Sequence, residues 1–225
     1  MNFLLTNDDG IDAPGIEALY EALGKRGVWV APKNQHSGCG HKVTTDQAIA
    51  VEQRGKDRYA VDGTPADCTR LGVVHFYPEV DWVIAGINAG GNMGIDSYLS
   101  GTVAAVREAA ILGHKAIAIS HWINKPRTID WVWASHWANA VFNTLWQEDL
   151  PPQHFWNVNL PHWQSGDPEP ELIFCEPSRD PLPVAFTIEG SNFFYRGEYS
   201  QRPRQPGSDI DVCFSGNIAI TQLKI

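Results

Sequence analysis

The stretch "FLLTNDDGIDAPG", residues 3–15, decides the fold because a short apolar run ends there in turn residues and a helical pattern follows. The run from Phe3 to Thr6 is typical of a buried strand. From Pro14 to Leu23, apolar residues recur at helical spacing before a glycine, which predicts a helix. A strand, a loop and a helix in this order predict the first unit of an α/β domain.

The same alternation of apolar strands and helices continues along the chain. Further strands are expected at "VWVAP", "WVIAGI", "KAIAIS" and "WNVNLP", residues 28–32, 82–87, 115–120 and 156–161. Helices are expected to begin after Thr64, after Ser100 or Thr102, and near Ile129. This pattern predicts a Rossmann-like, doubly wound, mostly parallel sheet with a β-rich C-terminal extension.

After Pro161 the composition of the chain changes, and prolines, polar residues and short predicted β segments follow. We therefore expect a catalytic α/β core over residues 1–160 and a β-rich region over residues 161–225, within one domain. The polar stretch "SQRPRQPGSD", residues 200–209, is expected to form a hairpin or extended arm that takes part in the oligomer contact.

The composition limits the classes of partner. The 225 residues carry 26 acidic and 17 basic side chains, a net charge of −9, which disfavours a polymeric nucleic acid or an anionic membrane as a partner. No apolar run approaches a membrane span and no secretory signal is seen, so we expect a cytoplasmic protein. The four cysteines lack metal-site spacing, which indicates free thiols.

Two adjacent carboxylates, Asp8 and Asp9, follow the first strand. One interpretation is turn chemistry alone, because Asn, Asp and Gly all favour turns. The other is a binding site, because ligands of open parallel sheets bind beyond the carboxyl ends of the strands. The first loop does not distinguish the two.

A second loop, "GINAGGNMGIDSYLSGTV" at residues 86–103, favours the binding site. It holds Asn88 and Asn92 and ends in a Ser-Gly-Thr step at a predicted helix start, where unpaired N–H groups favour a phosphate. It is neither a dinucleotide fingerprint nor a P-loop, since the required glycine and lysine spacings are absent. A flexible glycine loop with a capped helix is the ordinary alternative.

Together the two loops predict a divalent cation beside a phosphate. A cation would neutralise Asp8 and Asp9, and an all-oxygen set favours Mg²⁺ or Mn²⁺ over zinc. Ser37, in the loop after the second strand, could add a ligand. His36 and His41 in that loop are less expected as ligands, because single loop histidines are more often solvated or hydrogen-bonded.

At these residues the sequence resembles the SurE survival-protein family of metal-dependent 5′(3′)-nucleotidases and acid phosphatases. The resemblance is carried by "LLTNDDGIDAPGI", "HSG" with a following Thr, "DGTPADCTRLG" and "AGINAGGNMGIDSYLSGTVAAVREAAILG", and more faintly by "PGSDIDVCFSGNIAITQL". It implies one metal ion per subunit and a homodimer or homotetramer. The implied metal ligands are Asp8, Asp9, Ser37 and Asn88, and the implied phosphate contacts are Asn92, Ser100, Gly101 and Thr102.

The expected reaction is hydrolysis of a phosphomonoester, with a nucleoside 5′- or 3′-monophosphate as substrate and Asp8 orienting the attacking water or accepting its proton. Asp8 as a covalent nucleophile is disfavoured because the Asp-x-Asp-x-Thr pattern is absent. A metal-dependent N-deacetylase remains an alternative, although Thr6 and Asn7 stand where it usually has a histidine. A non-catalytic nucleotide-binding or stress protein is the other.

Overall fold

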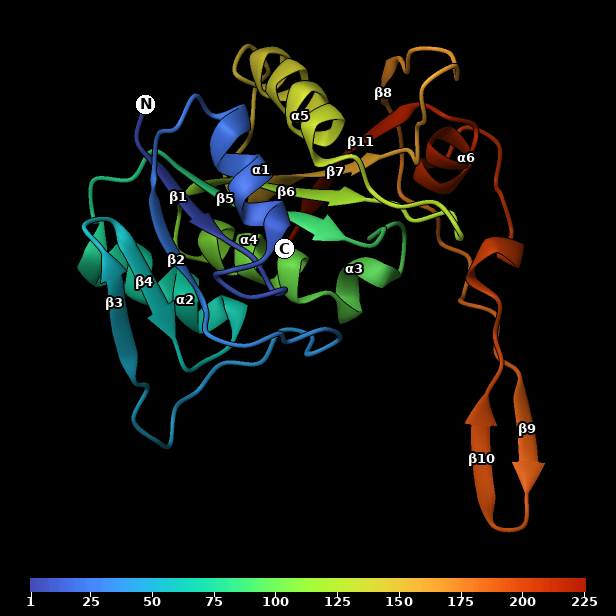
Figure 1. The fold of residues 1–225 in the computed structure, drawn as a ribbon, viewed down its shortest axis with the longest axis horizontal. Coiled ribbons are helices and arrows are strands. Elements are labelled where there is room, and N and C mark those ends of the chain that lie inside the picture. The colour runs from blue at the N-terminus through green and yellow to red at the C-terminus, as the bar shows by residue number, and fades with distance from the viewer.

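The computed structural model describes all 225 residues and is built around one nine-stranded sheet. The sheet runs in the order β3-β4-β2-β1-β5-β6-β7-β11-β8 (Figure 1). Its strands are β1 (Phe3–Thr6), β2 (Val28–Pro32), β3 (Val51–Gly55), β4 (Arg58–Val61), β5 (Trp82–Ala89), β6 (Lys115–His121), β7 (His154–Leu160), β8 (Leu172–Phe174) and β11 (Ile218–Lys224). Within this sheet only the β3–β4 and β7–β11 pairs are antiparallel, which confirms the predicted mostly parallel α/β fold.

Helices cover both faces of the sheet. They are α1 (Pro14–Ala22), α2 (Pro65–Leu71), α3 (Asp96–Leu99), α4 (Gly101–Ile111), α5 (Trp131–Leu145) and α6 (Asp209–Phe214), and α2 continues into a π-helical turn at Gly72–Phe76. The predicted N-caps of α2 and α4 are confirmed. The Thr64 side chain accepts a hydrogen bond from the Asp67 N–H, and the Ser100 side chain accepts one from the Val103 N–H. No helix combines the length and the apolar character that a membrane span requires.

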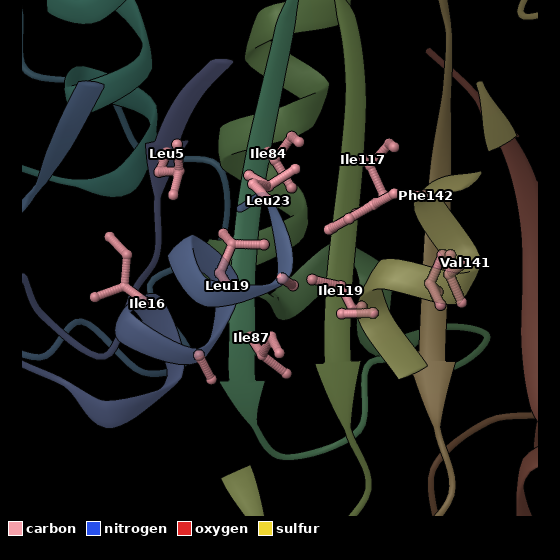
Figure 2. Close-up of a cluster of buried hydrophobic side chains, with 14 of the residues drawn as sticks. Leu5, Ile16, Leu19, Leu23, Ile84, Ile87, Ile117, Ile119, Val141 and Phe142 are labelled. Carbon is pink, nitrogen blue, oxygen red and sulfur yellow. The ribbon is translucent and has the colours of Figure 1, made fainter. Parts of the chain in front are cut away.

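Two apolar clusters fix the helices to the sheet. One lies between the sheet and the pair α1 and α5, where aliphatic side chains of β1, β5 and β6 face Leu19 of α1 and Phe142 of α5 (Figure 2). The other holds the small side chains of α2 and α4 against the opposite face. Full burial of an apolar side chain contributes roughly 1.5–3 kcal/mol, so these contacts hold the loops at the strand ends in place.

The β-rich end of the chain extends the same sheet. Strand β11 pairs with β7 in an antiparallel direction and with β8 in a parallel direction, and α6 packs against it through Ile210 and Cys213. Because one sheet crosses the boundary at residue 160, we propose that residues 161–225 belong to the same domain as residues 1–160. Helix α6 was not predicted; it is short and is marked mainly by Ser208, whose side chain caps it by accepting from the Asp211 N–H.

The projecting arm lies elsewhere than the sequence indicated. It is the hairpin of β9 (Phe186–Glu189) and β10 (Asn192–Tyr195), which extends away from the body (Figure 1). Gly190 begins its two-residue turn with a φ of 63°, a conformation that glycine adopts readily. The prediction of an arm at residues 200–209 is therefore wrong, because Arg202 in that stretch is buried and α6 begins at its end.

Candidate active site

The turn after β1 is built by Asn7 and Gly10. The Asn7 side chain donates to the Gly10 carbonyl at 2.7 Å and accepts from the Gly10 N–H at 3.2 Å, and Gly10 has a φ of 103°. These two residues supply the turn chemistry by themselves. The two aspartates between them are therefore left for other contacts.

Asp8 is buried against the start of α4. Only 4% of the residue is exposed, and the Thr102 hydroxyl donates to its Oδ1. Burial raises the pKa of Asp8 to about 6, with the neighbouring charge of Asp9 adding to the effect and the Thr102 hydrogen bond opposing it. A carboxylate in this setting is poorly compensated by the protein alone, and a bound cation would stabilise its charged form.

Asp9 connects the three predicted loops. Its Oδ1 accepts from the Gln35 side chain at 3.2 Å and its Oδ2 accepts from the Ala89 N–H at 3.1 Å. The same Gln35 amide donates to the Ser37 hydroxyl at 2.8 Å. The carboxylate of Asp9 is thereby held beside both the Ser37 loop and the end of β5.

All four predicted metal ligands line one cavity of about 270 Å³, together with Asn92 and Ser100. The Asn88 amide nitrogen donates to the Gly90 carbonyl at 2.7 Å, so the Asn88 side-chain oxygen is left to face another group. The side-chain atoms that the four predicted ligands offer are all oxygens, and no histidine lines the cavity. Two carboxylates with hydroxyl and amide oxygens fit Mg²⁺ or Mn²⁺, which keep several waters or phosphate oxygens as further ligands.

The first turn of α4 touches the aspartate loop directly. A Cβ built on Gly101 would stand 2.8 Å from the Cβ of Asp8 and 3.0 Å from the Cys39 sulfur, so only glycine fits here. The helix begins with N–H groups that have no partner four residues earlier, which favours an anion at this end. The structure thus brings Ser100, Gly101 and Thr102 against Asp8, while their contact with phosphate stays a prediction.

Asn92 is held by a buried polar network. Its N–H donates to the Asn159 side chain at 2.7 Å and its side-chain amide donates to the Ser120 hydroxyl at 2.8 Å. The Asn157 and Asn159 amides both donate to its carbonyl, at 2.8 and 3.1 Å. Neighbouring strands therefore fix the side of the cavity where Asn92 lies.

Comparison with known proteins places this geometry in a family. The sequence model described as "Survival protein SurE" matches residues 3–179. The chain belongs to the SurE family. The SurE crystal structure from Aquifex aeolicus superimposes with a TM-score of 0.87 at 32% identity, covering all of this chain and 93% of the other.

Named relatives of this SurE chain span its full length. A Synechocystis sp. protein described as a candidate 5′-nucleotidase is 97% identical over all 225 residues, which are the whole of both chains. The 5′-nucleotidase SurE of Paramagnetospirillum magneticum is 36% identical, covering 99% of this chain and 89% of its own. The predicted family is confirmed.

Several buried polar residues around the candidate site were not predicted from the sequence. Ser120 and Asn159 lie near the carboxyl ends of β6 and β7, so their place at the end of apolar runs was a usable signal. Asn157 lies in the middle of β7. Asp209 is fully buried and accepts from the Gly94 N–H at 2.6 Å across 115 positions of sequence. Arg202 had no local signal, because its partner lies 106 positions away.

Proposed function

We propose that the protein is a divalent-metal-dependent phosphomonoesterase that hydrolyses nucleoside 5′-monophosphates, and 3′-monophosphates as a second class, to nucleoside and phosphate. Its family and its relatives named 5′-nucleotidase support an enzyme of the nucleotidase class. The observation that carries the proposal is the direct contact between Asp8 and Thr102. It joins an oxygen-rich cation site to a helix N-terminus suited to an anion.

The residues of the site divide the work of binding and proton transfer. A bound Mg²⁺ or Mn²⁺ would supply electrostatic stabilisation of the phosphoryl oxygens. Asp8, Asp9, Ser37 and Asn88 would hold that ion. Asn92 and the start of α4 at Ser100, Gly101 and Thr102 would bind and orient the phosphate in line with a water.

Asp8 is the residue proposed to orient that water or accept its proton. Burial raises the pKa of Asp8 to about 6, and a bound cation would lower it again, which favours the charged form that a water can donate to. The Thr102 hydroxyl fixes its Oδ1, which leaves Oδ2 for the cavity. Direct attack by water needs no aspartyl-phosphate, in keeping with the absence of that sequence pattern.

A second cavity supports a nucleoside as the leaving group. It has a volume of about 660 Å³ and lies along Gly90 and Gly91, the residues between Asn88 and Asn92. Trp122, Lys125 and Tyr199 line it, which offers aromatic and cationic groups to a base and ribose. The two cavities share one loop, so a nucleotide could place its phosphate in one and its nucleoside in the other.

We further propose a homodimer or homotetramer that acts in the cytoplasm. The β9–β10 arm exposes Phe186, Ile188 and Phe193 at 54%, 64% and 66%, apolar surface that a second subunit would cover. The four cysteines are all free, which suits a reducing compartment.

The test is phosphate release from nucleoside 5′- and 3′-monophosphates and an aryl phosphate, with Mg²⁺, Mn²⁺ or EDTA, for the wild type and Asp8→Asn. We expect metal-dependent turnover, loss of turnover with EDTA, and a drop of at least about 10²-fold in kcat for Asp8→Asn, the range of a removed acid or base. Gln147→Ala, an exposed residue in the turn after α5, serves as the control. Full activity in EDTA would overturn the proposal, and tight nucleotide binding without phosphate release would indicate a binding protein.

A further inference from the structure

Arg202 is a fully buried cation in the segment between the arm and α6. Its side chain has 0% exposure, and its Nη1 donates to Oδ2 of Asp96 at 2.5 Å. Its Nη2 donates to the Met93 carbonyl at 3.3 Å, and its guanidinium lies over the Tyr199 ring at 4.9 Å. Removing a guanidinium from water is expensive unless it is paired, so Asp96 is its necessary partner.

Asp96 belongs to the wall of the candidate active site. It lines the 270 Å³ cavity together with Asp8 and Asp9. The Tyr199 hydroxyl and the Met93 N–H also donate to its Oδ2, at 2.6 and 3.2 Å. Its own carbonyl accepts from the Ser100 N–H at 3.0 Å, directly before α4.

This arrangement presents an electrostatic problem that Arg202 solves. Three carboxylates line a cavity that is to hold a phosphate, and a cation held by Asp8 and Asp9 leaves the charge of Asp96 uncompensated. The only ion pair of Asp96 is with Arg202. Arg107, the one basic residue of α4, does not pair with Asp96 but donates to the Ser97 carbonyl at 2.7 Å.

We propose that Arg202 is a positioning residue for phosphate binding, because it neutralises the charge of Asp96 at the cavity wall. The inference rests on the proposed function in so far as the bound anion is the phosphate of the substrate. The chain passes from Tyr195 at the end of the arm to Arg202 in seven residues, so the arm and the site are joined by this pair.

The expected effect is on affinity more than on turnover. At an effective dielectric constant of about 20, the repulsion between two like unit charges about 10 Å apart weakens binding by roughly tenfold. Arg202→Met is therefore expected to raise KM for a nucleotide, and the inhibition constant of inorganic phosphate, by about tenfold, with a change in kcat of less than about threefold. Neutralising the partner as well, in Asp96→Asn/Arg202→Met, should restore both constants to within about threefold of wild type.

The experiment compares these variants with Arg202→Lys, which keeps the charge, and with Arg204→Met, an exposed arginine in the same segment that serves as the control. Thermal melting confirms folding of each variant, and isothermal titration measures phosphate binding without turnover. A folded Arg202→Met with wild-type KM and phosphate affinity would overturn the inference. So would a folded double variant that remains tenfold weaker.

Two further outcomes are decisive. If Arg202→Met does not fold, the folded double variant decides: a KM near wild type supports neutralisation, and a tenfold rise in KM contradicts it. If neither variant folds, Arg202→Lys decides, again with a KM near wild type as support and a tenfold rise in KM as contradiction. If the wild type releases no phosphate from any ester, the proposed function fails. The inference is then judged by titration of inorganic phosphate alone, where a tenfold loss in Arg202→Met supports it and an unchanged affinity overturns it.

Discussion

Replacing Gly101 by alanine tests whether the contact between α4 and the aspartate loop is functional. The new Cβ would stand 2.8 Å from the Cβ of Asp8 and 3.0 Å from its Oδ2. Carbon atoms in favourable contact lie about 3.5 Å or more apart, so Asp8 or the helix must move by roughly 0.7 Å. A misplacement of about 1 Å in a reacting group can lower the rate about 10²-fold.

We therefore expect Gly101→Ala to lower kcat/KM by about 10- to 100-fold and to lower the free energy of unfolding by about 1–3 kcal/mol, the range for an overpacked site. The assay is initial-rate kinetics at saturating Mg²⁺ or Mn²⁺, with urea unfolding of the same preparations. Gly55→Ala is the control, because its Cβ would meet only the Arg58 side chain, at 3.8 Å. Unchanged kcat/KM in a Gly101→Ala enzyme that shows the expected loss of stability would refute the placement of the reaction beside Asp8.

Three other predictions follow from single contacts. Thr102→Val removes the hydroxyl that lowers the pKa of Asp8, and about 1.5 kcal/mol for a hydrogen bond to a charged group corresponds to a rise of about one pKa unit. Metal binding measured by titration should therefore weaken by about twofold at pH 7 and should be lost at a higher pH than in the wild type as the pH falls. An unchanged pH profile would argue against Asp8 as a ligand. Burial lowers the pKa of His121 from 6.5 to about 4, so the unfolded state takes up a proton at a higher pH than the folded state does. The free energy of unfolding should therefore fall as the pH drops from about 6.5 towards 4, by up to about 3 kcal/mol at roughly 1.4 kcal/mol per pKa unit. Urea unfolding should show this slope in the wild type and a reduced slope in His121→Gln. Asn159→Ala leaves the N–H of Asn92 without its buried acceptor, which should lower the free energy of unfolding by about 1–3 kcal/mol and raise KM. Steady-state kinetics that match the wild type would show that Asn92 does not need this hydrogen bond.

The sheet and the site loops were predictable because both depend on local pattern. The strands β1, β2, β5, β6 and β7 are short apolar runs, buried on both faces as a parallel sheet requires. Their carboxyl ends meet at one edge of the sheet, so the residues after β1, β2 and β5 had to lie close together. The sequence alone was therefore sufficient to bring Asp9, Ser37 and Asn88 to one place.

The C-terminal part could not be predicted in the same way, because its residues are placed by distant partners. Arg202 lies in a polar, proline-containing stretch of sequence, and such a composition is typical of a solvent-exposed loop. Its burial depends on Asp96, 106 positions earlier, and on Tyr199. The arm is the reverse case, since its aromatic strands resemble core strands but all eight of their residues are exposed.

The adjacency of Asp8 and Asp9 has a physical explanation in their different surroundings. Successive residues in the turn direct their side chains to different neighbours, so Asp8 meets Thr102 of α4 while Asp9 meets Gln35 and the Ala89 N–H. Asp8 is buried and its pKa is raised to about 6. Asp9 is partly open to solvent. The pair can therefore present carboxylate oxygens to one ion from two directions, because a single carboxylate could not face both the helix and the second loop.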